Sequence, residues 1–142
     1  MTSWDQRFLD LAQHVAGWSK DPSTKVGAVI VNSNRHVIGL GYNGFPRGVP
    51  DNESEMANRE TKLALTIHAE TNAVLNATAS VSGCALYVWP FMPCSNCAGM
   101  VVNAGIARVV APLHSSDSRW AESFERSARV FQCAGVVVDL RP

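Results

Sequence analysis

The sequence predicts a three-layer α/β/α fold with a five-stranded mixed central sheet. Short apolar runs alternate with helical patterns in the order αββαβαβαβ, and a helix separates each of the last three strands, as in parallel sheets. The chain has 142 residues, of which 46% are hydrophobic, so it can bury one sizeable core but not two. We therefore expect residues 1–142 to form a single domain.

An amphipathic helix is expected at the start of the chain. From Trp4 to Trp18, apolar residues recur at steps of three and four, which is the period of a helix with one buried face. Ser3 precedes this segment, and Gln6 follows three positions after Ser3, which is the spacing of a capping box. The Asp21-Pro22 pair then ends the helix.

A β-hairpin is expected next. Residues 26–31 and 36–41 are strand-forming runs on either side of the turn-forming residues 32–35. Glycine and proline dominate residues 41–48, and the polar residues 49–60 continue the loop, with room for one short helical turn.

The second half of the chain alternates helices and strands. Pro93 can occupy the first position of a helix, and Gly105 can end it. The expected helices cover residues 66–79, 93–104 and 118–133, and the expected strands cover residues 84–89, 106–111 and 136–140.

Charge and hydropathy exclude several classes of protein. Lys and Arg number 12 and Asp and Glu number 12, so we expect no nucleic-acid partner and no anionic membrane surface. The longest apolar runs, such as Val26 to Val31, are far shorter than the roughly 18 residues of a membrane span. No secretory signal precedes them, so we expect a cytoplasmic protein, or one in the host cytoplasm if the chain is viral. In that reducing setting, Cys84 and Cys133 are expected to be small core residues.

Two short motifs could together bind a metal. His68-Ala-Glu70 lies 26 residues before Cys94, and Cys97 follows Cys94 at the i, i+3 spacing of one helical face. Two thiolates at a helix N-terminus and a neutral His68 would give zinc three protein ligands and leave a fourth position open, as in catalytic sites. Glu70 could then move a proton between water and a substrate. Since residues i and i+2 diverge by about 200° on a regular helix, His68 and Glu70 converge only if the helix points its N-terminal end at the site.

Three plainer interpretations of these residues stay open. The cysteines could form a structural zinc knuckle, form a redox pair, or lie by chance near a helix-capping histidine. A zinc finger would need closer histidines, and a redox pair would leave His68 and Glu70 without a role. The combined H-x-E and P-C-x-x-C pattern matches the signature of zinc nucleobase deaminases.

The sequence resembles the deoxycytidylate (dCMP) deaminase family of the cytidine-deaminase superfamily over nearly its whole length. Four segments carry the resemblance: residues 19–31 (SKDPSTKVGAVIV), 41–48 (GYNGFPRG), 68–73 (HAETNA) and 93–98 (PCSNCA). The zinc motifs are common to the superfamily, whereas Gly-Tyr-Asn-Gly followed by Pro is narrower. The resemblance implies a cytidine-deaminase-like fold and hydrolysis of dCMP to dUMP and ammonia, which feeds thymidylate synthesis.

The resemblance also implies roles for individual residues. One zinc ion would be held by His68, Cys94 and Cys97, and Glu70 would protonate N3 of cytosine and then the leaving amine. The implied substrate-binding residues are Asn43, which contacts the sugar, Ala69, and Trp120, which borders the substrate cleft. For the phosphate, Thr24, Lys25 and Arg119 are candidates by their position in loops only. The plainer alternatives are a turn asparagine at 43, solvated residues at 24 and 25, and a helix-packing tryptophan at 120.

The family resemblance further implies allosteric control. Such enzymes are commonly homohexamers that dCTP activates and dTTP inhibits, with Mg²⁺ accompanying the triphosphate. Gly44 and Arg47 would contact the effector, because glycine permits close backbone approach and arginine suits phosphate. A loop surface charge is the equal alternative for Arg47. Residues 49–67 contain no Cys or His, so the second zinc of some relatives is not expected.

Two other functions stay open. The chain could deaminate cytidine, guanine, a riboflavin precursor or tRNA adenosine, although its neutral charge disfavours tRNA. It could also be a non-catalytic binding module stabilised by zinc. Glu70 disfavours the module, because a structural zinc site does not need that acid.

Overall fold

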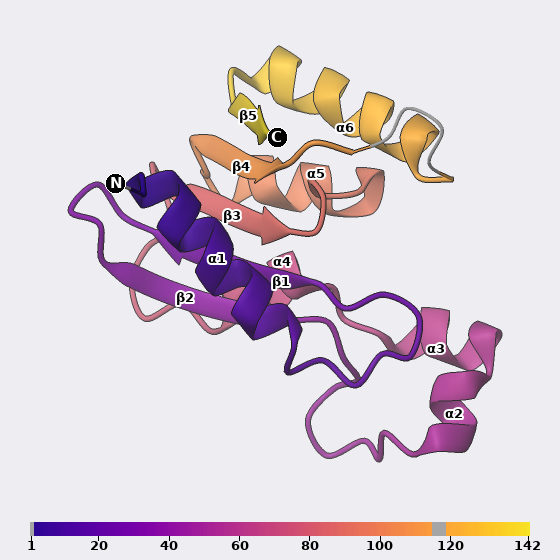
Figure 1. The fold of residues 1–142 in the computed structure, drawn as a ribbon. Helices are drawn as coiled ribbons and strands as arrows, with labels where there is room; N and C mark the ends of the chain where they lie inside the picture. Colours follow the sequence, from indigo (N-terminus) through magenta and orange to yellow (C-terminus); the bar gives the residue numbers. More distant parts are fainter. Residues whose placement is uncertain (1, 115–118) are drawn as a thin grey trace.

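A computed structural model describes residues 2–114 and 119–142 of the chain, which form a five-stranded mixed sheet flanked by helices (Figure 1). The order of the strands is β2-β1-β3-β4-β5. β1 runs antiparallel to both of its neighbours, whereas β3, β4 and β5 run parallel, as the alternation of helices and strands predicts. The strands are β1 (Gly27–Val31), β2 (Val37–Tyr42), β3 (Ala85–Trp89), β4 (Arg108–Pro112) and β5 (Val137–Arg141).

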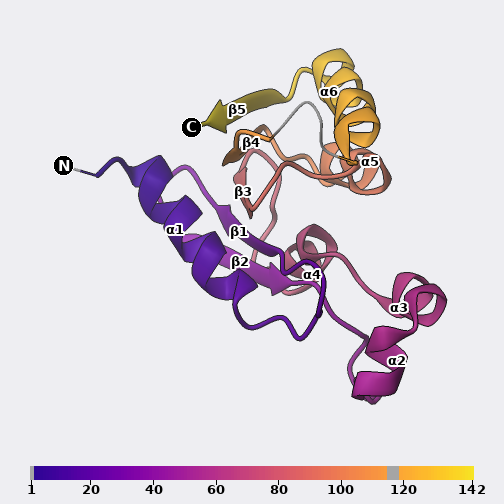
Figure 2. The same cartoon turned by 45° about the vertical axis from the view of Figure 1, so that its right-hand side comes forward.

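Helices cover both faces of this sheet. α1 (Trp4–Ala16) lies on one face, and α4 (Ala69–Leu75), α5 (Ser95–Asn103) and α6 (Ala121–Ala134) lie on the other. Two short helices, α2 (Glu53–Ala57) and α3 (Arg59–Leu65), project from one end of the sheet (Figure 2). The three-layer α/β/α arrangement is therefore confirmed. In the described part of the chain, no helix is long and apolar enough to cross a membrane.

The core consists of two apolar layers, one on each face of the sheet. Successive residues of a strand point to opposite faces, so Val29 packs with Phe8 under α1 while Ala28 and Ile30 face α4 and α5. Burial on both faces explains why residues 26–31 form a continuous apolar run in place of an alternating one.

Two helices begin later than the sequence predicts, and both corrections concern the metal motifs. The helix expected at residues 66–79 spans only Ala69–Leu75, because Ile67 forms a β-bridge with Gly44 and His68 takes the N-cap position. The helix expected to start at Pro93 starts at Ser95, with Cys94 as its N-cap. Each motif thus places a candidate ligand at the end of a helix.

The first helix ends at Ala16, with Gly17 as its C-cap, and so stops before the Asp21-Pro22 pair that was expected to end it.

The polar segment expected as a loop contains further differences. Asn52 and Asn58 cap α2 and α3, since their side-chain oxygens accept hydrogen bonds from the backbone N–H groups of Glu55 and Thr61. α3 was not predicted, because a helix of 7 residues is too short to show a clear apolar period. The expected start of the last helix, at residue 118, lies outside the described residues, and α6 begins at Ala121.

The two cysteines outside the metal motifs differ in burial. Cys84 is buried, as expected for a small core residue. Cys133 is exposed, so its predicted place in the core is wrong. It lies in the last turn of α6, where its neighbours Gln132 and Ala134 are also exposed.

Glycine lets α4 lie directly on β2. A Cβ atom added to Gly41 would lie 2.3 Å from the backbone N of Ala73 and 2.4 Å from the carbonyl oxygen of Ala69. These distances are shorter than real Cβ contacts, so the helix can approach the strand only where no side chain intervenes. The contact fixes the position of α4, and with it His68 and Glu70.

Side-chain amides of α4 strengthen the same contact. Nδ2 of Asn72 donates to the carbonyl oxygen of Tyr42 at 2.8 Å, and Nδ2 of Asn76 donates to that of Leu40 at 3.1 Å. Both carbonyls belong to β2, the edge strand of the sheet. The helix is thus bound to the strand by hydrogen bonds as well as by packing.

We expect Gly41→Ala to lower the free energy of unfolding by about 1–3 kcal/mol, because α4 must shift away from β2. Zinc affinity should fall as well, since the shift moves His68 relative to the cysteines. Gly99→Ala is the matched control: Gly99 is exposed on α5, nothing lies within 4 Å of an added Cβ, and alanine favours helix. Urea unfolding and competition with a chromogenic chelator measure both effects, and equal behaviour of the two variants would contradict the packing argument.

Candidate metal centre and active site

The candidate site lies at the end of the sheet where several loops meet. In β1, Gly27 pairs with Tyr42 at the end of β2 and with Trp89 at the end of β3. The loop entering β1 and the loops leaving β2 and β3 therefore lie side by side. Crevices beyond the carboxyl ends of parallel strands are common ligand sites in α/β proteins.

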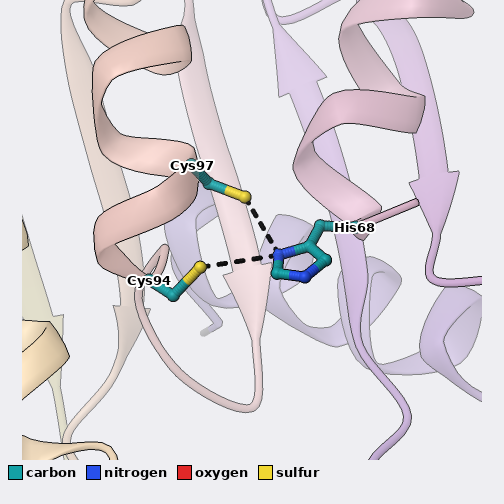
Figure 3. Close-up of side chains that lie close together, drawn as sticks. All are labelled: His68, Cys94 and Cys97. Atoms are coloured by element: carbon teal, nitrogen blue, oxygen red, sulfur yellow. Dashed lines mark hydrogen bonds between the residues drawn. The ribbon is translucent and has the colours of Figure 1, made fainter. Parts of the chain in front are cut away.

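Three potential metal ligands converge at this end of the sheet (Figure 3). Nδ1 of His68 lies 3.1 Å from Sγ of Cys97 and 3.5 Å from Sγ of Cys94. The three atoms all lie within 4.8 Å of one another. His68 comes from the N-terminal end of α4 and the cysteines from the first turn of α5, so the two helix ends form the cluster together.

The ligand set fits zinc. Two ligand atoms on a tetrahedral zinc ion, with bonds of about 2.0–2.3 Å, lie roughly 3.5 Å apart, close to the separations of His68 from the cysteines. Two thiolates and one imidazole form a soft donor set that suits zinc. Cys97 is buried, whereas His68 and Cys94 are partly exposed, so the cluster is accessible from one side.

The two thiols differ in acidity. A hydrogen bond from Cys97 and the neighbouring His68 ring lower the pKa of the Cys94 thiol to about 4, against the opposing effect of burial. The same hydrogen bond, together with burial, raises the pKa of Cys97. Hydrogen bonding with Cys94 raises the pKa of His68. The lowered pKa of Cys94 favours its thiolate, the form that binds a metal, whereas the raised pKa of Cys97 means that a divalent cation has to displace a proton from that thiol.

Glu70 lies beside the cluster in the first turn of α4. His68 precedes this helix, with extended backbone angles of φ −69° and ψ 153°, so the two side chains are freed from the divergence of a regular helix. His68 and Glu70 therefore both lie at the N-terminal end of α4. Glu70 is 4% exposed, and burial raises its pKa to about 7. A carboxyl group with that pKa can both accept and donate a proton near neutral pH.

Asn43 is buried beneath the loop that enters β1. Its Oδ1 accepts a hydrogen bond from the backbone N–H of Val26 at 2.9 Å, and its Nδ2 donates to the carbonyl oxygen of Thr24 at 2.9 Å. Thr24 is half-buried and Lys25 is exposed, next to each other in this loop. The structure therefore brings three of the sequence-predicted substrate residues into one group.

Ala69 is the first residue of α4, and Trp120 is the N-cap of α6. Ala69 is fully buried between His68 and Glu70. Trp120 precedes α6, with its ring centroid 5.8 Å from that of Phe91, three residues before Cys94. This contact is compatible with either a cleft wall or a helix-packing residue.

The two predicted effector residues lie in the loop after β2. Gly44 exchanges backbone hydrogen bonds with Ile67, the residue before His68. Arg47 is exposed and donates to the side-chain oxygen of Asn76, the C-cap of α4, at 3.3 Å. This loop therefore contacts both ends of the helix that carries Glu70.

A buried ion pair between Asp21 and Lys62 lies near this site and was not predicted from the sequence. An Asp followed by Pro, Ser and Thr is a turn signal, so the bonds from Asp21 to its own loop could have been predicted. Nothing local in the sequence pairs Asp21 with a lysine 41 residues later.

Comparisons with known proteins agree with this geometry. The family model described as the cytidine and deoxycytidylate deaminase zinc-binding region matches residues 2–113. A protein of Aliivibrio fischeri described as an uncharacterized deaminase in the luxG 3' region is 43% identical over 144 residues, covering 100% of this chain and 96% of the relative. Human deoxycytidylate deaminase is 36% identical over 152 residues, covering 96% of this chain and 85% of the human protein.

A solved structure also matches in fold. The crystal structure of dCMP deaminase from the cyanophage S-TIM5, in complex with dCMP and dUMP, superposes with a TM-score of 0.76 at 25% identity. The match covers 95% of this chain and 94% of the phage enzyme.

Proposed function

This chain belongs to the cytidine and deoxycytidylate deaminase family, and on that premise we propose that its substrate is dCMP. The family makes it a zinc-dependent deaminase, a hydrolase whose His68, Cys94 and Cys97 are consistent with one zinc ion per chain. The proposed reaction converts dCMP and water to dUMP and ammonia and supplies dUMP for thymidylate synthesis. The observation that carries the choice of substrate is the full-length match to a dCMP deaminase that holds dCMP and dUMP.

Glu70 has the central role in the proposed mechanism. Zinc, held by His68, Cys94 and Cys97, would supply Lewis-acid activation of the attacking water. Glu70 removes a proton from that water and delivers it to N3 of cytosine as the new C4–O bond forms. It then carries the second proton to the amine, the C4–N bond breaks, and ammonia leaves. The raised pKa of Glu70 supports this exchange, because the carboxyl group must be both base and acid in one cycle.

The remaining site residues position the nucleotide. Oδ1 of Asn43, which already accepts one hydrogen bond, has a second lone pair for a hydroxyl group of the sugar. Thr24 and Lys25 supply a hydroxyl and a cation for the phosphate, and Trp120 walls the base. Ala69, between His68 and Glu70, contacts the nucleotide through its backbone.

Allosteric control by dCTP and dTTP, with Mg²⁺ bound to the triphosphate, is part of the proposal. Gly44 and Arg47 form the effector contacts. Their bonds to Ile67 and Asn76 support a route from the effector loop to both ends of α4. We further propose a homohexamer in the cytoplasm, or the host cytoplasm if the chain is viral, in which residues 1–142 act as one catalytic domain.

Conversion of dCMP to dUMP by zinc-loaded protein, followed by ultraviolet absorbance, tests the proposal. Parallel reactions contain magnesium alone, dCTP or dTTP, and cytidine and deoxycytidine replace dCMP in a second series. We expect turnover of dCMP, raised by dCTP and lowered by dTTP. Turnover indifferent to both triphosphates would overturn the allosteric assignment, and preference for an unphosphorylated nucleoside would overturn the substrate.

A further inference from the structure

A buried ion pair joins the loop that enters β1 to helix α3. Nζ of Lys62 lies 3.2 Å from Oδ1 of Asp21, and the two side chains are only 11% and 8% exposed. Removing two charges from water is costly unless the pair is well hydrogen-bonded. Because burying the pair is costly, the hydrogen bonds of Asp21 indicate its role.

The carboxylate of Asp21 organises the whole entry loop, defined here as residues 21–26. Its Oδ1 also accepts hydrogen bonds from the backbone N–H groups of Ser23 at 2.8 Å and Thr24 at 3.0 Å. Its Oδ2 lies 3.5 Å from Nδ2 of Asn43. Burial alone would raise the pKa of Asp21, but the bonds from Thr24 and Ser23 and the charge of Lys62 lower it. The carboxylate is thus held ionised at the base of the loop.

Lys62 reaches this carboxylate from outside the sheet. It lies in α3, which projects from the end of the sheet, and it is the buried residue of that helix. Oδ1 of Asp21 already accepts hydrogen bonds from two backbone N–H groups of the entry loop. The ammonium group of Lys62 is its third donor and neutralises its charge. Asn43 holds the other end of the loop through Thr24 and Val26.

We propose that Lys62 is a positioning residue, which through Asp21 holds the entry loop in the conformation that presents Thr24 and Lys25 to the phosphate of the substrate. The identity of that substrate rests on the proposed function. Lys62 itself does not touch the nucleotide. Its loss therefore raises KM and leaves the chemical step at Glu70 and the metal cluster nearly unchanged.

The chain contains a matched control. Lys20 forms an ion pair with Asp51 at 3.2 Å, which joins the residue before the entry loop to the loop before α2, but its side chain is 69% exposed. An exposed pair of this kind contributes little. Lys20→Met therefore removes a lysine and an ion pair beside the loop without uncovering a buried charge.

The experiment compares Lys62→Met, Lys62→Arg and Lys20→Met in zinc-loaded protein. We expect Lys62→Met to raise KM for dCMP by about tenfold or more with kcat within about threefold. Lys62→Arg keeps the charge and should restore most of the affinity, and Lys20→Met should change KM by less than about twofold. Zinc content should stay at one ion per chain in all three.

The double variant Asp21→Asn/Lys62→Met guards against loss of folding. It removes both charges while keeping a side-chain oxygen for Ser23 and Thr24, so it should fold where Lys62→Met does not, and its KM should still be raised. Backbone hydrogen exchange of residues 21–26 gives a readout that needs no turnover, and it should quicken in Lys62→Met and the double variant but not in Lys20→Met.

Two results would overturn the proposal. One is an unchanged KM in folded Lys62→Met or in the folded double variant, and the other is unchanged hydrogen exchange of the entry loop in these variants. If the unmodified protein does not deaminate dCMP at all, the proposed function fails, while hydrogen exchange still decides whether Lys62 holds the loop.

Discussion

Glu70→Gln should bind zinc normally and deaminate dCMP about 10²- to 10⁴-fold more slowly, the usual contribution of a general acid–base group. Glutamine has nearly the same shape and keeps a carbonyl oxygen, but it cannot carry a proton between the water, N3 and the leaving amine. The structure makes this substitution conservative, because burial already favours the uncharged form of Glu70. Steady-state kinetics and zinc content on the same preparation measure both halves of the prediction.

Glu60→Gln is the control for this experiment. Glu60 also lies in the first turn of a short helix, α3, but it is exposed and lies outside the metal motifs. Its activity should stay within about twofold of the unmodified protein, as is usual for surface substitutions. A Glu70→Gln variant with unchanged turnover would contradict the acid–base role of Glu70.

Loss of one zinc ligand should abolish both metal binding and activity. Cys94→Ala leaves two ligands, so zinc should fall from one ion per chain to a small fraction of that, and deamination should become undetectable. Cys133→Ala is the matched control, because Cys133 is an exposed free cysteine at the far end of α6. Elemental analysis, circular dichroism and the dCMP assay distinguish the outcomes.

Folding of the zinc-free protein separates catalysis from a structural role of the metal. Both apolar layers of the core pack on the sheet, and most of their residues lie outside the metal cluster. We therefore expect chelation to remove activity while the secondary structure persists, and added zinc to restore turnover. If the zinc-loaded protein catalyses no deamination and chelation unfolds it, zinc has a structural role and the chain is a zinc-stabilised module in place of an enzyme.

The fold was largely predictable, because its elements have strong local signals. The alternation of apolar runs and helices predicted the mixed sheet, and the continuous apolar run of residues 26–31 indicated a buried strand. The helix boundaries at His68 and Cys94 were less predictable. Ile67 leaves the expected helix to pair with Gly44, a tertiary contact that no local pattern encodes.

The metal cluster could be predicted from spacing, whereas its surroundings could not. Cys94 and Cys97 lie close in sequence, and a histidine two residues before Glu70 completes a motif that is specific to zinc chemistry. The partners of Asp21 and Asn43 depend on how distant loops meet at the end of the sheet. Lys62 lies in a helix too short to be recognised, so its pairing with Asp21 required the three-dimensional structure.

The amides of α4 also affect how this protein meets other chains. The backbone N–H of Asn43 points to Val26, so the carbonyl of Tyr42, in the same peptide unit, points away from β1 toward the free edge of the sheet. Asn72 and Asn76 already bind that carbonyl and the carbonyl of Leu40, two residues earlier. An unpaired edge strand invites strands from other molecules to add to it and so promotes aggregation. Here part of that edge is already saturated from within the chain, which leaves β2 a poor template for intermolecular sheet growth.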